Sequence, residues 1–314
     1  MQNSRIAPKL SPGMILAPGS ILALGSILAL GLALISAPSL AAAQTADIPA
    51  AIWRDPPADA AHPARMVTLH IPSGGVEING VAYLAAGAGP HPTVIVCHGL
   101  PGNEKNLDLA QALRRQGWNA ITFNYRGSWG SPGAFHFAQN PQDLHAVLTY
   151  LRSAAQAKAL AIDVTRLAVV GHSMGGWVTA MDGGDEPGVV ALGLFSAANM
   201  GEVGTLPHAD LVRFMRENDE TLAGTSVSEL ADELGQHSAA FNFEAKAQSL
   251  THVPMLVLTA NDGLAGMSEA LVAAVRKAGG NQAELAHIAT DHSWSDRRID
   301  LETRIIRFLQ PYFA

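Results

Sequence analysis

The sequence has a single cysteine, Cys97, among its 314 residues, so no disulfide can form within the chain. Clusters of thiolates that bind metal are excluded for the same reason. The HExxH pattern of zinc proteases and the GxxxxGK[ST] pattern of phosphate-binding loops are also missing, and the histidines show no ligand spacing. We therefore expect neither a metal ion nor a cofactor, and a core that is stable without cross-links.

Charged side chains are also few, at 15% of all residues. There are 20 Lys and Arg against 27 Asp and Glu, which gives a net charge of -7, and basic residues adjoin only in isolated doublets, at Arg114-Arg115, Arg276-Lys277 and Arg297-Arg298. Nucleic-acid binding depends on clustered positive charge, so we expect no nucleic-acid partner. The hydrophobic content of 48% is enough to bury a large core in one or two domains.

The N-terminal segment has the features of an export signal. Residues 1–9 are positively charged, residues 21–35 are almost wholly apolar, and Ala41 and Ala43 fit the small-residue pattern of a cleavage site. Residues 1–43 are therefore predicted to be a signal peptide, and the mature protein to be periplasmic or secreted.

An uncleaved membrane anchor is the alternative for this segment. The uncharged residues 14–36 approach the ~20 apolar residues that span a bilayer, although Pro18, Gly19 and Gly25 weaken that interpretation. After cleavage we expect no stable membrane insertion. Residues 44–65 are rich in Ala, Pro and Asp, which predicts a loose lead-in.

From residue 66 to residue 314 the chain alternates between strand-like and helix-like periods. The expected strands are residues 66–71, 76–84, 93–99, 119–125, 166–172, 188–197, 254–260 and 283–289, and the expected helices are residues 106–117, 141–157, 267–280, 297–313 and one beginning at residue 174. Alternation of this kind predicts an α/β domain with a mainly parallel sheet covered on both faces. Residues 198–253 contain helical patches but no clear strand, which predicts a helical cap over the strand ends.

Residues 167–177, LAVVGHSMGGW, end an apolar strand at a serine between glycines. Ser173 would stand at the carboxyl end of a buried parallel strand, where such sheets bind ligands. A turn from strand to helix within two or three residues strains the serine backbone; Gly171 and Gly175 leave the necessary room, and Gly176 lets the helix pack closely. We predict that Ser173 is a nucleophile pushed out into solvent, with a tight structural turn as the alternative.

A serine hydroxyl needs a base to remove its proton. His292 is the predicted base because it follows the final strand and would emerge at the sheet edge that carries Ser173; a surface or core role is the alternative. His98 lies after an early strand, and His172 should point away from its neighbour Ser173, so both are less suitable as the base. The other histidines considered fall in loops, helices or the cap: His136, His145, His208, His237 and His252.

Asp262 is the predicted partner of the base. It lies just past the penultimate strand, and the chain order Ser173, Asp262, His292 is that of one hydrolase fold. Asp291 is the nearest rival, but adjacent residues of an extended segment point to opposite sides. Asp143 fits a helix N-terminus instead. A turn at the strand end is the alternative role for Asp262.

Attack on a carbonyl also requires backbone donors for the negative oxygen that forms. The N–H of Met174 follows the nucleophile directly, and the segment HGLPG, residues 98–102, ends the strand from which the second donor should come, most plausibly that of Leu100. An ordinary glycine turn is the alternative interpretation of HGLPG.

These segments together resemble the α/β-hydrolase superfamily, in particular its compact members similar to dipeptidyl aminopeptidase and acyl-peptidase catalytic domains. The motifs that carry the resemblance are HGLPGNEKN, NYRGSWGSPG, GHSMGG, the Asp262 loop and DHSW. The resemblance runs from about Met66 to the C-terminus, with the cap poorly matched. It implies an eight-stranded sheet with an antiparallel second strand, the three catalytic roles given above, and a bracing role for Arg126 and Gly127.

Two departures from the family limit what the resemblance implies. The HGGG form of the oxyanion loop is absent, so the lipases and esterases that carry it are not the nearest kin. No propeller domain precedes the catalytic part, which argues against a dedicated dipeptidyl peptidase.

The sequence thus predicts an exported serine hydrolase that cleaves small carboxylic esters through an acyl-enzyme. A peptidase or amidase of the acyl-peptidase type is the first alternative, and a non-catalytic binding protein on the same fold is the second. Nothing in the sequence specifies an oligomeric state. The predicted apolar pocket residues are Trp129, Phe214 and Met215, with Phe241 and Phe243 also in the cap; their helical spacing is equally typical of core packing.

Overall fold

A computed structural model describes residues 48–313 of the chain. The predicted signal peptide and the start of the predicted lead-in lie outside these residues. Within the described range, no helix combines the length and the apolar character needed to cross a membrane.

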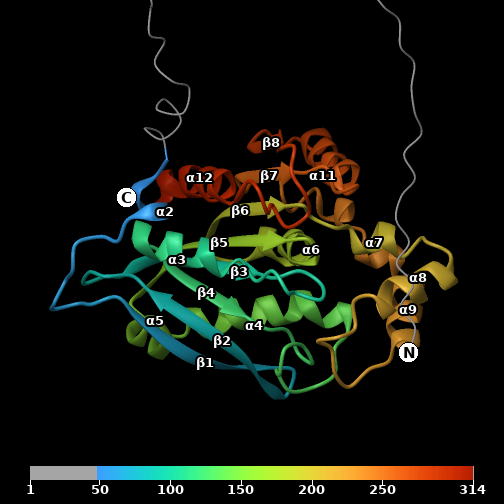
Figure 1. The fold of residues 1–314 in the computed structure, drawn as a ribbon, viewed down its shortest axis with the longest axis horizontal. Coiled ribbons are helices and arrows are strands. Elements are labelled where there is room, and N and C mark those ends of the chain that lie inside the picture. The colour runs from blue at the N-terminus through green and yellow to red at the C-terminus, as the bar shows by residue number, and fades with distance from the viewer. Residues whose placement is uncertain (1–47, 314) are drawn as a thin grey trace, which may run out of the picture. The chain divides into compact units, whose positions relative to one another are not determined.

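Eight strands form one sheet in the order β1-β2-β4-β3-β5-β6-β7-β8 (Figure 1). The strand β2 runs antiparallel to both β1 and β4, and every other neighbouring pair is parallel, so the predicted fold class and the antiparallel second strand are confirmed. The strands are β1 Arg65–Ser73, β2 Val76–Leu84, β3 His91–Cys97, β4 Asn119–Phe123, β5 Ile162–His172, β6 Val189–Phe195, β7 Met255–Thr259 and β8 Ala283–His287.

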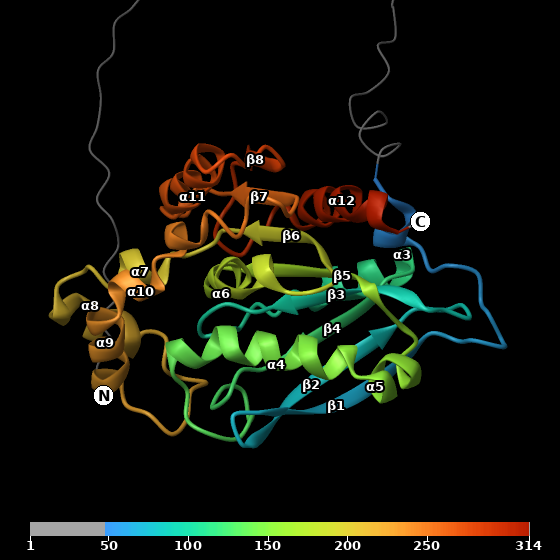
Figure 2. The ribbon, with the colours of Figure 1, turned by 180° about the vertical axis from the view of Figure 1, so that it is seen from behind.

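Helices cover both faces of the sheet (Figures 1 and 2). The helices α3 Leu107–Gln116 and α12 Arg298–Leu309 pack on one face, and α4 Asn140–Arg152, α6 Met174–Asp182 and α11 Ala265–Lys277 pack on the other. Alternate residues of the central strands pack into the two hydrophobic cores, one on each face of the sheet. Successive side chains of a strand point to opposite faces, so apolar runs without polar alternation are what a sheet buried on both sides requires.

Two segments depart from their predicted structure. The expected helix over residues 141–157 is broken at Ser153, whose extended backbone (φ -60°, ψ 137°) separates α4 from α5, Ala154–Ala159. Serine favours such a break because its side chain caps the next helix, here by accepting from the N–H of Gln156.

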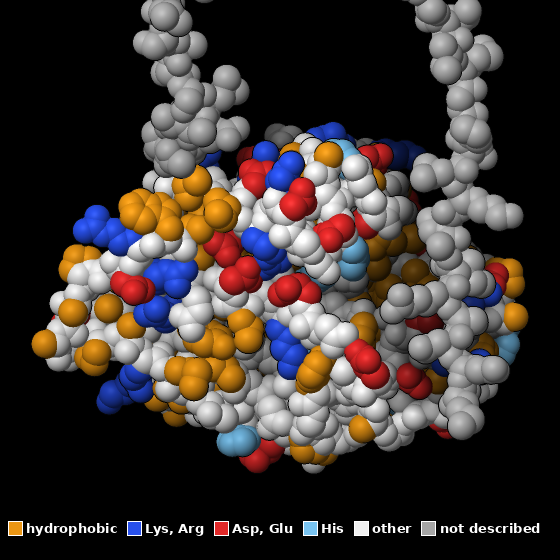
Figure 3. Space-filling view, viewed as in Figure 1, with side chains coloured by type: hydrophobic (Ala, Val, Ile, Leu, Met, Phe, Trp, Pro, Cys, Tyr) orange, Lys and Arg blue, Asp and Glu red, His pale blue; other side chains and the backbone are white. Residues whose placement is uncertain are grey.

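The predicted loose lead-in, residues 44–65, also contains structure. A short helix, α2 Ala50–Trp53, packs beside α3 and is held by Arg115, whose guanidinium donates to the carbonyl oxygens of Ala51 and Ile52. Hydrophobic side chains gather over α2 in Figure 3, where Trp53 is 66% exposed. Elsewhere on that face acidic and basic side chains are interleaved, without a broad basic patch.

A helical segment is inserted between β6 and β7, and we call it the cap. It comprises α7 Met200–Val203, α8 His208–Arg216, α9 Val227–Gln236, α10 Ser238–Phe241 and the 3-10 turn η3 Phe243–Lys246. Figure 2 shows these helices beyond the carboxyl ends of β6 and β7. Trp177 of α6 anchors the cap, because its indole N–H donates to the carbonyl of Phe241 at 2.6 Å.

Candidate active site

The turn between β5 and α6 places Ser173 at the carboxyl edge of the sheet. Its backbone has φ 56° and ψ -123°, a region that side chains rarely adopt, so the predicted strain is confirmed. A Cβ at Gly171 would lie 2.1 Å from the carbonyl oxygen of Gly175, and one at Gly175 would lie 2.1 Å from that of Cys97. The glycines therefore let α6 begin in direct contact with the backbone of β3.

Ser173 itself is only 7% exposed, so the expectation that the turn pushes it out into solvent is wrong. The loop after β3 covers it: a Cβ at Gly99 would lie 2.8 Å from the Cβ of Ser173. On the other side, the N–H of Ser173 donates to the carbonyl of Phe195 at 3.1 Å, and the N–H of Ala198 donates to the carbonyl of Ser173 at 3.1 Å. The serine thus lies between the end of β6 and the loop that follows β3.

His292, in the loop after β8, pairs with Asp262, in the loop after β7. The Nδ1–H of His292 donates to Asp262 Oδ2 at 2.9 Å, and the N–H of Leu264 donates to Asp262 Oδ1 at 3.0 Å. The Asp262 side chain is 2% exposed and that of His292 is 39% exposed. Burial opposes ionisation of Asp262, but hydrogen bonds from His292, Leu264 and Ser196 outweigh it and lower the pKa of Asp262 to about 2.

The two rival carboxylates are engaged elsewhere. Asp291 is exposed and accepts from the N–H of Ser295 at 2.8 Å. Asp143 lies in the first turn of α4, as predicted, but it is buried and accepts from the backbone N–H and from Nε of Arg126 at 2.9 and 2.6 Å. Arg126 is thereby tied to α4, which fits the bracing role that the resemblance implies for it.

The segments of Ser173 and His292 meet through His172. The Nε2–H of His172 donates to the backbone carbonyl of His292 at 2.8 Å, and the centroids of the two rings are 4.7 Å apart. Among the described residues, Ser173 Oγ makes no hydrogen bond to His292. Such bonds are often long in unliganded enzymes and tighten when substrate binds.

Sequence reasoning missed the contact between His172 and His292. The expectation that His172 points away from Ser173 left no role for it, and periodicity carries no information on which loop from another strand lies against its ring. Ser196 was missed for the same reason, although its side chain helps to lower the pKa of Asp262 and its hydroxyl accepts from the indole N–H of Trp294 at 3.0 Å.

The two predicted oxyanion donors lie on either side of the Ser173 turn. Met174 is the first residue of α6, so its N–H has no acceptor within the helix. Over the described range, the N–H of Leu100 donates to no protein group. Both N–H groups are therefore available to a ligand oxygen.

The loop that carries Leu100 is braced at both ends. The Nδ1–H of His98 donates to the carbonyl of Gly99 at 2.8 Å, and the ring of His98 lies 4.7 Å from that of Tyr125, edge to face. Pro101 accepts from the indole N–H of Trp129 at 2.7 Å and from the hydroxyl of Thr221 at 2.9 Å. Trp129 thus holds the loop in place, a contact that the pocket prediction did not include.

The predicted pocket residues of the cap divide into two groups. Met215 and Phe243 are completely buried in the core, which differs from the predicted pocket role. Met215 lies one helical turn after Leu211 in α8, and these two are the buried residues of that helix, so packing of its apolar face against the core accounts for them. Phe214 is partly buried against the same core, and Phe241 is buried against Trp177.

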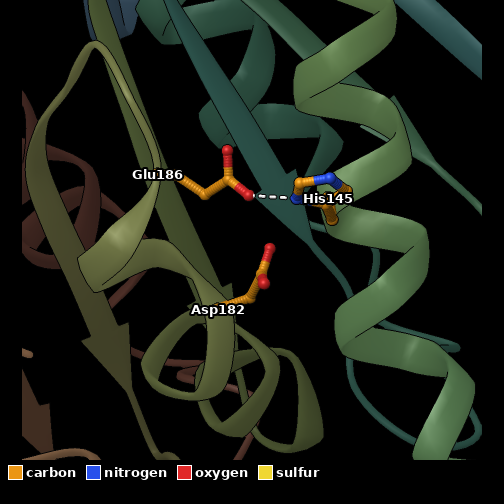
Figure 4. A group of neighbouring side chains, drawn as sticks. All are labelled: His145, Asp182 and Glu186. Atoms are coloured by element: carbon orange, nitrogen blue, oxygen red, sulfur yellow. Dashed lines mark hydrogen bonds and ion pairs between the residues drawn. The ribbon is translucent and has the colours of Figure 1, made fainter.

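Three side chains on the α4 side of α6 bring potential metal ligands together (Figure 4). The ligand atoms of His145, Asp182 and Glu186 all lie within 4.8 Å of one another. Glu186 already accepts from His145 and from Arg152, and burial together with Glu186 raises the pKa of Asp182 to about 7. Asp182 is the last residue of α6, roughly 13.5 Å along the helix from Ser173, so this cluster is separate from the candidate active site.

Comparison with protein families gives one match that covers most of the domain. The family described as "Alpha/beta hydrolase family" matches residues 94–304. Among curated proteins, the chain is similar to the Acylamino-acid-releasing enzyme 1 of Oryza sativa subsp. japonica, with 36% identity over 108 residues, 31% of this chain and 13% of that enzyme. It is also similar to an uncharacterised protein of Mycobacterium tuberculosis, with 29% identity over 102 residues, 32% of this chain and 34% of that protein. The matched segments thus span 13% and 34% of the length of these relatives.

Solved structures share the fold at low sequence identity. A thermophilic and thermostable carboxylesterase cloned from a metagenomic library, EstE1, superposes with a TM-score of 0.60 at 21% identity, covering 81% of this chain and 91% of that chain. The acylaminoacyl peptidase of Pyrococcus horikoshii superposes with a TM-score of 0.59 at 16% identity, covering 79% of this chain and 41% of that chain.

Acid is expected to destabilise the protein through two buried histidines. Burial lowers the pKa of His98 to about 4 and that of His172 to about 3, from an ordinary value of 6.5. Below pH 6.5 the unfolded chain binds protons at both sites while the folded chain does not, so the free energy of unfolding falls as the pH drops. The slope is at most about 1.4 kcal/mol per pH unit for each histidine, and this loss is absent above pH 6.5.

Urea unfolding between pH 7.5 and pH 4.5 would measure this slope. The variant His172→Gln cannot bind the second proton and should show a shallower decline over the same range. Equal slopes in wild type and variant would contradict the assignment of His172 as a neutral buried group.

Proposed function

Because this chain belongs to the alpha/beta hydrolase family, we propose that it is a serine hydrolase that cleaves carboxylic esters through an acyl-enzyme intermediate. In this proposal Ser173 is the nucleophile, His292 the general base and Asp262 the group that orients the base. The observation that carries it is the 2.9 Å hydrogen bond from His292 Nδ1 to Asp262 at the sheet edge that carries the strained Ser173 turn.

The proposed first stage forms the acyl-enzyme. With Nδ1–H donated to Asp262, the other ring nitrogen of His292 is free to take the proton of Ser173 as Oγ attacks the ester carbonyl. The ionised Asp262 stabilises the imidazolium that results, and His292 then gives the proton to the departing alcohol. The low pKa of Asp262 supports this role, since the carboxylate stays charged throughout the working range of pH.

The negative oxygen of the tetrahedral intermediate would accept from the N–H groups of Leu100 and Met174. Each donor of this kind can stabilise the transition state by about 3 kcal/mol. Their fixed positions support the proposal, because the loop of Leu100 is braced through Pro101 and Met174 begins a helix whose N-terminal dipole favours negative charge. In the second stage water attacks the acyl-enzyme with His292 again acting as base, and Ser173 is released.

Amide cleavage is the second candidate function. It is favoured by the 36% identity over 108 residues to a protein named acylamino-acid-releasing enzyme. The same residues would serve, but an amine leaves less readily than an alcohol and needs its proton from His292 earlier in the reaction. We place ester cleavage first because it demands nothing beyond this machinery. A non-catalytic binding protein remains the alternative from another class.

The nucleophile prediction is that wild type hydrolyses p-nitrophenyl esters of short acids and is labelled by a fluorophosphonate probe. Ser173→Ala should fold normally and lose both activities, whereas Ser295→Ala, an exposed serine in the His292 loop, should keep both. Faster turnover of aminoacyl anilides than of esters would favour the amidase, and wild type that resists labelling would favour the binding protein.

The prediction for the orienting residue is that Asp262→Asn lowers kcat by about 10⁴-fold, because the amide no longer holds His292 in the required tautomer. Asp291→Asn removes the neighbouring exposed carboxylate and should leave kcat unchanged. Activity of Asp262→Asn close to that of wild type would assign the orienting role to another group.

Export is a further part of the proposal, supported by the charge and apolar pattern of residues 1–43. Expression of the full chain in a bacterium should yield a mature protein that starts at Gln44 in the periplasm or the medium. Intact mass spectrometry of each fraction would measure this. A chain that keeps residues 1–43 in the membrane fraction would instead support the uncleaved anchor.

A further inference from the structure

His172, the residue before Ser173, is held between two rings at the carboxyl end of β5. It is 4% exposed. On one side it stacks on Phe195, with centroids 5.0 Å apart and planes at 19°. On the other side it lies against His292, with centroids 4.7 Å apart and planes at 39°. Its ring therefore forms a buried wall beside the imidazole of His292.

The tautomer of His172 follows from its partner. Nε2 lies 2.8 Å from the backbone carbonyl of His292, and a carbonyl can only accept, so Nε2 carries the proton. Nδ1 is buried and has no partner in the described part of the chain. Burial, followed by the charge of His292, lowers the pKa of His172 to about 3, so the ring stays neutral beside a base that becomes charged.

The segment that carries His292 is held from its other end by Trp294. Trp294 is completely buried with φ 60°, packs edge to face on Phe195 with centroids 6.4 Å apart, and donates its indole N–H to Ser196. Phe195 thus contacts both His172, whose ring lies against that of His292, and Trp294, which follows His292 by two residues. The imidazole of His292 is itself 39% exposed, so its orientation depends on these neighbours and on Asp262.

We propose that His172 is a positioning residue for His292, an inference that rests on the proposed function. Its Nε2–H fixes the backbone carbonyl of His292, and its ring limits the tilt of the imidazole, while Asp262 fixes the rotation about the ring. The N–H donor does most of this positioning, and the flat neutral ring adds to it. Phenylalanine keeps the ring without the donor, and glutamine keeps an N–H donor without the ring.

The test compares His172→Phe and His172→Gln with wild type in ester hydrolysis. We expect His172→Phe to lower kcat and the rate of fluorophosphonate labelling by on the order of 10- to 100-fold, with KM within about twofold of wild type, since a misplaced base slows chemistry without weakening binding. His172→Gln, which keeps an N–H donor, should retain most of the wild-type kcat. Equal losses in the two variants would overturn the role of the Nε2–H, and a change confined to KM would overturn the positioning role.

A matched control separates positioning from loss of stability. Val147→Ala removes a completely buried side chain from α4, on the other face of the sheet, and should lower the unfolding temperature while leaving kcat unchanged. If kcat falls in Val147→Ala as far as in His172→Phe, the effect of His172 is one of stability and the proposal fails. If His172→Phe does not fold, His172→Met takes its place, because methionine also lacks an N–H donor; its kcat should fall while that of Val147→Ala does not, and equal kcat values would overturn the proposal.

A spectroscopic measurement distinguishes failure of this inference from failure of the proposed function. The His292 Nδ1 proton, held by a carboxylate, should give a downfield ¹H NMR signal that Asp262→Asn removes. We expect that signal to broaden or vanish in His172→Phe and to persist in His172→Gln, whether or not the protein turns over esters. An unchanged signal in His172→Phe would overturn the positioning role. If the NMR signals behave as expected but the fluorophosphonate probe does not label wild type, only the proposed esterase function is overturned.

Discussion

The contact between the first turn of α6 and the backbone of β3 is the constraint on which the candidate site depends. Gly175 sits where any side chain would collide with the carbonyl of Cys97. Because the helix begins this close to the strand, the chain has only Ser173 and its neighbours in which to turn, and Ser173 takes the strained backbone that results. The same closeness brings the loop of Gly99 and Leu100 down onto the serine. One steric condition thus positions the proposed nucleophile and both proposed oxyanion donors.

The charges around this turn are arranged so that only one group changes its ionisation in the proposed mechanism. Asp262 is held as a carboxylate by hydrogen bonds that outweigh its burial. His98 and His172, the two buried histidines that flank Ser173, are both held neutral by burial. A proton taken from Ser173 would therefore reside on His292, whose ring is hydrogen-bonded to the fixed negative charge of Asp262, which favours the imidazolium.

The features of the fold and of the candidate site that could be predicted are those that leave a pattern within a short stretch of sequence. Continuous apolar runs identified the buried strands, because a strand covered on both faces has no polar side, and GxSxG identified the tight turn, because only glycine fits its close contacts. Contacts between loops from different strands carry no such signal, so the ring of His172 against His292 and the hydrogen bond from Trp294 to Ser196 were missed. Met215 could not be distinguished from a pocket residue, because an amphipathic helix has the same apolar pattern whether its apolar face packs on the core or lines a pocket. The burial of Ser173 depends on where the Gly99 loop lies, which no local pattern specifies.

Backbone strain is concentrated at this sheet edge, and its distribution argues for a preformed site. Ser173, Ser196 and Trp294 all have positive φ, at 56°, 47° and 60°, and all three lie at or beside the residues proposed for chemistry. A conformation of this kind costs about 1–3 kcal/mol per residue and persists only where the surroundings over-determine it. Here the indole N–H of Trp294 donates to the hydroxyl of Ser196. The backbone of Ser173 is hydrogen-bonded to Phe195 at the carboxyl end of β6 and to Ala198 just beyond it. The strain at each residue is therefore offset by contacts with its neighbours, which hold the segments of the proposed base, orienting carboxylate and nucleophile at one edge of the sheet; the bond between Ser173 and His292 is left for substrate binding to complete.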